Sequence, residues 1–177
     1  MSDIKLAIIY YSMGGTNYQL AKWAAEAGKE AGAEVRLLKV RELAPQSVID
    51  SNPAWKAHLE ATKDIPEATP EDLDWADAII FSTPTRFGVM ASQMKQFLDT
   101  TGGLWAQGKT VNKVVSAMSS AQNPHGGQEA TILSLPYGTS VSVDEDGKMV
   151  ENVEAAVKHQ VKRTVTVARW LKKGREG

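Results

Sequence analysis

The stretch KLAIIYYSMGGTN, from Lys5 to Asn17, constrains the fold of this chain more than any other. Residues 5–11 form a near-continuous apolar run, which is typical of a parallel strand buried on both faces. A glycine- and hydroxyl-rich loop follows, made of Ser12, Met13, Gly14, Gly15, Thr16 and Asn17. Such a loop before a helix presents backbone N–H groups and the positive end of the helix dipole. It predicts an anion site, most often for a phosphate, or else an ordinary strand-to-helix loop.

The residues after this loop predict a parallel βαβ unit. Residues 18–31 can form a helix with a face of small residues that packs closely on a sheet, and Gly32 is suited to end it. A second strand is expected directly afterwards, over residues 34–40. Two strands joined through a helix in this way should be parallel, with a right-handed crossover.

Two more strands are predicted further along the chain, over residues 77–83 and 113–118. Residues 41–73 contain four prolines, and we expect them to form an excursion over the surface. Within it, the sequence predicts a short helix over 54–62 and a helix that begins at Thr69. Helices are also expected over 91–100, from near Gln128, and over 153–172. Residues 139–143 form a weak strand at best.

This order of elements predicts an α/β fold with an open, doubly wound parallel sheet. Ligands of such sheets bind at the carboxyl ends of the strands. Three expected loops at this edge, 12–17, 83–88 and 119–127, are rich in Gly, Ser, Thr, Asn and Gln. Their convergence indicates one ligand site.

Composition excludes several classes of function. The 177 residues, 42% hydrophobic and 23% charged, fit one globular domain over 1–177. A net charge of -1 disfavours nucleic acid as a partner, and the absence of cysteine excludes disulfides, thiol nucleophiles and thiolate metal sites. The N-terminal apolar run is too short to cross a bilayer and lacks a basic flank. We therefore expect a cytoplasmic enzyme or binding protein, with no membrane insertion.

The first loop does not match the common nucleotide motifs. No lysine follows Gly14 or Gly15 as a P-loop requires, and the dinucleotide pattern G-x-G-x-x-G is absent. Neutral donors and a helix dipole could still hold one phosphate. With two further loops able to flank a flat ring, the pattern indicates a mononucleotide, and FMN is the leading candidate.

Several segments together resemble the WrbA-type (tryptophan-repressor-binding-protein-like) NAD(P)H:quinone oxidoreductases, which are FMN enzymes with a flavodoxin-like fold. The matching segments are YYSMGG at 10–15, AIIFSTPTRFG at 78–88, QMKQFLDTTGGLW at 93–105, GGQE at 126–129 and PYG at 136–138. The resemblance implies two-electron reduction of a quinone by NADH or NADPH, with hydride passing through flavin N5. The alternative is a flavodoxin-like FMN-binding electron carrier, or a regulatory binding module without turnover.

The resemblance also implies roles for individual residues. It places the FMN phosphate in loop 12–17. It places the isoalloxazine along Pro84, Thr85, Arg86, Phe87 and Gly88, and the other side of the ring and the ribityl chain against Ser119, Ser120, Ala121 and Gln122. Trp105 would come from a neighbouring subunit of a homotetramer (or dimer) to wall the nicotinamide or quinone site. Because the cofactor carries the hydride chemistry, we expect no catalytic protein side chain and no metal.

The sequence departs from the family pattern at three places. Gly14 stands where relatives often carry an aromatic residue, and Thr16 stands where histidine is common. At Leu135–Pro136 the chain lacks the end of a helix, a fifth strand and a glycine-rich loop. Either a flexible stretch of the natural polypeptide is omitted here, or the protein has a true deletion. No fifth parallel strand is expected at this join, because a parallel crossover needs about a dozen residues or more.

Overall fold

Parallel strands in the order β2-β1-β3-β5-β6 form the sheet of the computed structural model, which describes residues 4–123 and 138–176. They are β1 (Lys5–Tyr10), β2 (Glu34–Lys39), β3 (Ala78–Arg86), β5 (Val114–Ala121) and β6 (Thr139–Ser142). A short strand, β4 (Val89–Met90), pairs antiparallel with the end of β3. The first two strands are parallel and flank α1 (Thr16–Glu30), so the predicted βαβ unit is confirmed.

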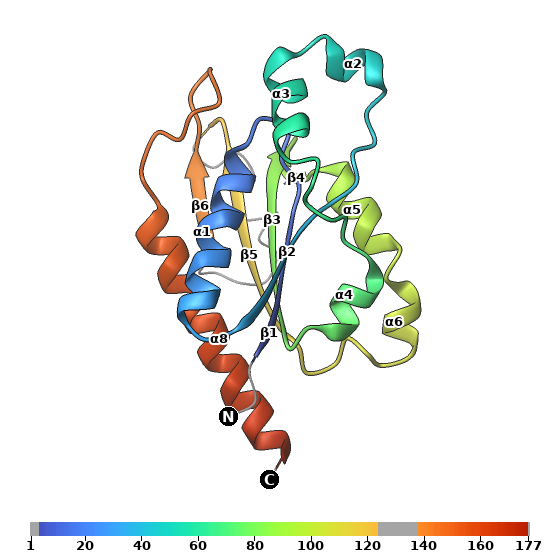
Figure 1. Ribbon diagram of the computed structural model, residues 1–177, viewed down its shortest axis with the longest axis vertical. Helices are drawn as coiled ribbons and strands as arrows, with labels where there is room; N and C mark the ends of the chain where they lie inside the picture. The colour runs from blue at the N-terminus through green and yellow to red at the C-terminus, as the bar shows by residue number, and fades with distance from the viewer. Residues whose placement is uncertain (1–3, 124–137, 177) are drawn as a thin grey trace.

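Helices cover both faces of the sheet (Figure 1). Because side chains alternate along a strand, Leu6, Ile8 and Tyr10 of β1 pack on one face against α1 and α8 (Glu154–Glu176). The neighbouring positions, Ala7 and Ile9, pack on the other face against α4 (Pro70–Trp75) and α5 (Ser92–Asp99). Both halves of the core are thus built on a central strand that is apolar and buried from Leu6 to Tyr10, as the predicted doubly wound α/β fold requires.

Close packing of α1 on the sheet depends on its small residues. Ala21, Ala24 and Ala27 are fully buried. A Cβ atom at Gly28 would lie 2.7 Å from Leu6 Cδ2 and 3.0 Å from Val35 Cγ2, which is closer than side chains tolerate. The predicted small-residue face therefore brings the helix into direct contact with β1 and β2, and this fixes where the helix N-terminus lies.

The predicted surface excursion contains three short helices: α2 (Gln46–Asp50), α3 (Pro53–Ala61) and α4. The side chain of Asn52 accepts a hydrogen bond from Trp55 N (3.0 Å), which starts α3 at the predicted place. Thr69 precedes α4, and the Asp72 carboxylate accepts from its N–H (3.0 Å), as expected for a helix that begins at Thr69. A further short helix, α6 (Gly102–Ala106), follows α5.

Two predicted loops are wrong in part, because the strands before them are longer than expected. β3 runs through Pro84 to Arg86, and β5 continues to Ala121. Phe87 (φ 51°) and Gly88 (φ 84°) then make a two-residue turn into β4. Residues 83–86 and 119–121 are therefore strand rather than loop. The expectation failed because proline and serine usually end strands, whereas here the pairing of β3 with β5 extends to Pro84 and Ser120.

The expectation that residues 139–143 are a weak strand at best is also wrong. β6 pairs in parallel with Met118–Ala121 and completes the five parallel strands among the described residues. The interval between Ala121 and Thr139 is long enough for a crossover of about a dozen residues. The side chain of Gln160, on α8, bridges the start of β6 to β5. Its carboxamide oxygen accepts from Thr139 N (2.7 Å) and its nitrogen donates to Ala117 O (2.9 Å). The join at Leu135–Pro136 and the helix expected from Gln128 lie outside the described residues.

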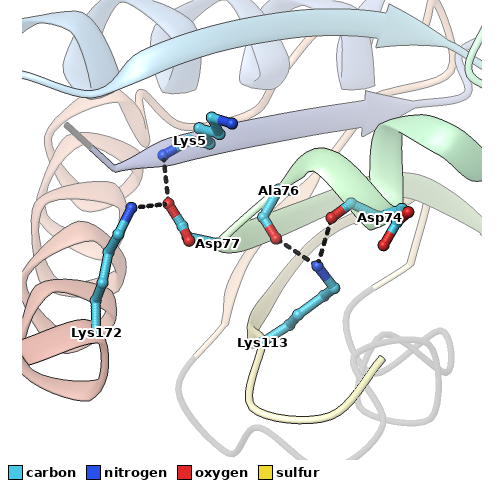
Figure 2. A network of polar contacts seen from close by, with 6 residues as sticks. All are labelled: Lys5, Asp74, Ala76, Asp77, Lys113 and Lys172. Atoms are coloured by element: carbon cyan, nitrogen blue, oxygen red, sulfur yellow. Dashed lines mark hydrogen bonds and ion pairs between the residues drawn. The ribbon is translucent and has the colours of Figure 1, made fainter. Parts of the chain in front are cut away.

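A polar network ties the elements together at the end of the sheet where the strands begin (Figure 2). Asp77 Oδ2 accepts from Lys5 N and from Lys172 Nζ, each at 3.0 Å, and so links β1, β3 and α8. Burial raises the pKa of Asp77, but the hydrogen bonds from Lys5 N and Lys172, with the charges of both lysines, outweigh it and lower the pKa overall. Lys113 Nζ donates to Asp74 O (2.9 Å) and Ala76 O (2.6 Å), the carbonyls at the end of α4. No helix in residues 4–123 and 138–176 is long and apolar enough to cross a membrane.

We predict that Asp77→Asn lowers the free energy of unfolding by about 1–2 kcal/mol at neutral pH, because it removes a charge that accepts two hydrogen bonds. The pKa of Asp77 is lower in the folded state than in the unfolded state. Its contribution is therefore complete above the unfolded value of about 3.9 and is lost as the pH falls through the folded pKa. Urea unfolding from about pH 7 down to pH 3 measures this.

The matched control is Asp64→Asn, at an exposed position. Its stability should stay within about 0.5 kcal/mol of the natural protein at every pH. An Asp77→Asn effect that persists undiminished at acid pH would contradict the assignment.

Candidate functional site

A cavity of about 310 Å³ lies at the carboxyl ends of β1, β3 and β5. This volume is at the lower end of the range for small-molecule sites. All three predicted segments contribute to its lining: Ser12, Met13, Gly14, Thr16, Asn17, Pro84, Arg86, Ser120, Ala121 and Gln122. The predicted convergence of strand ends is therefore present in the structure.

The N-terminus of α1 opens toward this cavity and is free to bind an anion. Gly15 precedes the helix with φ 101°, and the helix has no side-chain cap and no acidic residue in its first turn. Ser12 Oγ accepts from Gly15 N (3.0 Å), which shapes the loop. The N–H groups of a first helical turn have no intrahelical partners, and with the helix dipole they favour negative charge. These N–H groups can hold a phosphate group without the help of a lysine side chain.

Buried hydrogen bonds fix this loop to the two neighbouring strands. Asn17 Nδ2 donates to Ser82 Oγ (3.2 Å), and Ser82 Oγ donates to Asn17 O (3.1 Å). Ser120 Oγ donates to Asn17 Oδ1 (2.6 Å). Asn17, Ser82 and Ser120 are all buried. Asn17 thus joins the start of α1 to β3 and β5 at the cavity and positions the phosphate-type loop.

The end of β3 and its hairpin supply the cation of the site. Among the described residues, Arg86 is the cation that lines this cavity. Its Nη1 donates to Thr85 O (3.2 Å), and its Nη2 lies 3.9 Å from Met13 Sδ. The side chain of Phe87, in a left-handed conformation, is fully exposed. The predicted residues Gly15, Thr85, Phe87, Gly88 and Ser119 do not line the cavity but belong to its supporting strands and turns.

Two walls of the cavity were not predicted. Asn52, Ala54 and Trp55, at the start of α3, form one wall, and the segment 143–147 after β6 forms the other. Thr16 Oγ1 donates to Gly147 O (3.1 Å), which holds the second wall against α1. The rule that ligand sites lie at carboxyl ends of strands could have found 143–147, had residues 139–143 been read as a strand. No comparable sequence signal pointed to Trp55.

The second wall is acidic, because Asp144, Glu145 and Asp146 all border the cavity. Asp144 Oδ1 accepts from Asp146 N (3.0 Å) and Lys148 N (2.8 Å) and so folds this turn. Within 4–123 and 138–176, no group of three or more His, Asp or Glu side chains is arranged to hold a metal ion. The three acidic side chains therefore make this wall of the cavity negatively charged.

His58 lies close to the α1 N-terminus but does not add positive charge to it. It is half-buried on α3, its ring is 5.5 Å from that of Tyr18, and burial, with a smaller effect of Lys39, lowers its pKa. The imidazole is therefore neutral near pH 7. Attraction of an anion depends on the helix amides and Arg86.

Trp105 does not line the cavity. It lies on α6, with 76% of its surface exposed, and α6 is nearer the end of the sheet where the strands begin (Figure 1). A role for Trp105 at a ligand site of this kind requires that it act on a different copy of the chain.

The fold and the cavity define a flavodoxin-like α/β protein with a mononucleotide-type site. A solved flavodoxin, WrbA-like protein from Agrobacterium tumefaciens has the same fold, with a TM-score of 0.64 at 23% sequence identity over 95% of this chain and 99% of that one. The model of the family described as NADPH-dependent FMN reductase matches residues 4–143. The chain belongs to this family, and the predicted WrbA-type resemblance is confirmed.

Two relatives illustrate the family. A protein named NAD(P)H dehydrogenase (quinone) from Deinococcus radiodurans is 52% identical over 197 residues, covering 96% of this chain and 98% of the relative. A protein of the same name from Brucella abortus is 48% identical over 134 residues, which cover 76% of this chain and 65% of the relative. The first alignment is longer than the 177 residues of this chain, so the Deinococcus protein has residues that this chain lacks.

We predict that Gly15→Ala and Gly14→Ala have different effects although they are adjacent. At Gly15 (φ 101°) any side chain is strained, so alanine should lower the free energy of unfolding by about 1–2 kcal/mol and weaken binding at the α1 N-terminus. At Gly14 a Cβ atom would have no neighbour within 4 Å, and alanine should change stability by less than about 0.5 kcal/mol. Thermal or urea unfolding measures both effects. Equal stability of the two variants would contradict this account of the loop.

Proposed function

We propose that this chain catalyses the FMN-dependent two-electron reduction of quinones by NAD(P)H. The observation that carries the proposal is the convergence of the ends of β1, β3 and β5 on one cavity at an uncapped helix N-terminus. The name NAD(P)H dehydrogenase (quinone), borne by a relative that is 52% identical along nearly its whole length, supports the same conclusion.

The residues of the cavity suit FMN from phosphate to ring. The Ser12–Asn17 loop would hold the phosphate through backbone amides and hydroxyls, as the sequence resemblance implied. Pro84 and Arg86 would border one side of the isoalloxazine, and Ser120 to Gln122 the other. The bound FMN supplies a hydride acceptor and donor at N5. No protein acid or base is needed for that transfer.

The contribution of the chain is to orient the ring and adjust its electrostatics. The Arg86 guanidinium is held by Thr85 O at one edge of the cavity, where positive charge favours the reduced, anionic flavin. Arg86→Met should leave FMN bound but lower kcat/KM for quinone reduction by about tenfold, which corresponds to ~1.4 kcal/mol. Arg175→Met, on the exposed last turn of α8, is the matched control and should not change the rate.

The decisive assay loads the protein with FMN and follows oxidation of NADH and of NADPH, with and without benzoquinone. Consumption that requires both FMN and quinone is the expected result. FMN binding without any consumption of NAD(P)H would instead support the electron carrier or binding module. Failure to bind flavin would overturn the proposal, and the two donors measured side by side give the nicotinamide preference.

We also propose that the protein is cytoplasmic, where reduced nicotinamide is available, and forms a homotetramer (or dimer) of single flavodoxin-like domains over 1–177. The exposed Trp105, distant from the cavity of its own chain, supports assembly, because a partner copy could bring it to a substrate site. Native mass spectrometry tests both assembly and chain length. A monomer would contradict the assembly. A subunit mass of 19.2 kDa would establish a true deletion at Leu135–Pro136 rather than an omitted stretch.

A further inference from the structure

The Glu42 carboxylate is the centre of a hydrogen-bond network beside the cavity. Its Oε2 accepts from Tyr11 OH and from Trp55 Nε1, each at 3.1 Å. Its Oε1 accepts from Gln93 Nε2 (2.8 Å), Leu43 N (2.8 Å) and Ala44 N (3.0 Å). Gln93 Nε2 also donates to Tyr11 OH (2.9 Å), which closes the network. Five donors on one carboxylate are more than an ordinary surface side chain attracts.

Each side-chain donor comes from a different segment that borders or supports the cavity. Tyr11 ends the run of β1 and directly precedes Ser12, the first residue of the phosphate-type loop. Trp55 is itself a cavity wall and is only 9% exposed. Gln93 belongs to α5, which follows the hairpin that carries Arg86. Glu42, in the excursion after β2, therefore binds side chains from three segments. They are the end of the β1 run before the phosphate-type loop, the α3 wall of the cavity, and α5.

The charges in the network favour one arrangement of its protons. Burial raises the pKa of Glu42, but hydrogen bonds from Ala44 N, Gln93, Leu43 N and Tyr11 outweigh it, and the pKa is lowered overall. Burial, followed by the charge of Glu42, raises the pKa of Tyr11. At neutral pH the carboxylate is therefore ionised and the phenol is protonated, so Tyr11 donates to Glu42. In this state every hydrogen bond to Glu42 is assisted by its charge.

We propose that Glu42 is a positioning residue that holds the Trp55 indole as a wall of the cavity, so that Trp55 packs against the bound FMN. This inference rests on the proposed function, since it takes FMN as the occupant. The indole N–H bonded to Glu42 fixes the ring at one edge, and Trp55 lines the cavity. The ion pairs near α3, Lys56–Asp50 and Lys63–Glu60, are exposed and of little energetic weight, and Lys39 Nζ holds the far end of α3 through Thr62 O (2.8 Å). Glu42 is thus the side chain that holds the indole at the cavity end of α3.

The test uses Glu42→Gln, which keeps the shape of the side chain but replaces one acceptor oxygen with an NH₂ group, together with Trp55→Phe and the double variant. Glu60→Gln and Trp170→Phe, both at exposed positions, are the matched controls. Each protein is titrated with FMN, and the Kd and the fluorescence of the bound flavin are measured. An indole in contact with the flavin quenches its fluorescence, so both test variants should bind FMN about tenfold more weakly and regain flavin fluorescence. The controls should do neither.

If Glu42 acts through Trp55, the double variant should bind FMN as Trp55→Phe does, within about twofold. Losses of affinity that multiply, or an unchanged Kd and fluorescence in Glu42→Gln, would overturn the proposal. A natural protein that binds no FMN would instead overturn the proposed function, so the two failures are distinguishable.

A second measurement separates positioning from a general loss of folding. In the apoprotein, the indole N–H signal of Trp55 in a ¹H–¹⁵N spectrum is assigned by its loss in Trp55→Phe. In Glu42→Gln this signal should shift and its hydrogen exchange should accelerate, whereas the indole signals of the other four tryptophans stay in place. Changes at all five tryptophans would mean that the substitution disturbs the whole fold, and would contradict the specific role of Glu42.

Discussion

The hydrogen bonds of Asn17 are the interaction on which the site depends. They join the start of α1 to Ser82 on β3 and Ser120 on β5, entirely within the buried interior. A buried polar group without a partner costs several kcal/mol, so the hydrogen bonds among these three residues stabilise this mutual arrangement. The same bonds set the distance between the phosphate-type loop and the strand ends that flank the ring. Without them, no side chain among the described residues would tie the start of α1 to the ends of β3 and β5 in this way.

The electrostatics of the site follow from the use of neutral donors. The loop before α1 attracts an anion through amides and hydroxyls, and Arg86, whose Nη2 lies 3.9 Å from Met13 Sδ, borders the same cavity. A lysine at the phosphate would have been stronger, but helix amides are already oriented and need no side-chain ordering. The acidic segment 144–146 lines the same cavity beside α1 and limits how much further negative charge can collect there. Positive and negative groups thus border one small site.

Local sequence patterns predicted most of the elements because the signals were strong. The near-continuous apolar run of β1, the small-residue face of α1 and the start of α4 at Thr69 were each visible in a few neighbouring residues. The ends of strands were predicted less well. Pro84 and Ser119 appeared to terminate strands, yet pairing between β3 and β5 carried both strands further. Local propensity was overridden there by the neighbouring strand.

The sequence by itself determined the doubly wound fold, the loop with an open helix N-terminus and the family, because these depend on residues that are adjacent in the chain. Only the tertiary structure decided which distant residues complete the cavity. Trp55 reaches it through the excursion after β2, where Glu42 binds its indole N–H, and the segment 143–147 reaches it because β6 pairs in parallel with β5. The tie between Glu42, Tyr11 and Gln93 likewise joins residues from three separate segments. Such contacts depend on how helices and strands pack, and no periodicity or motif in a single segment records them.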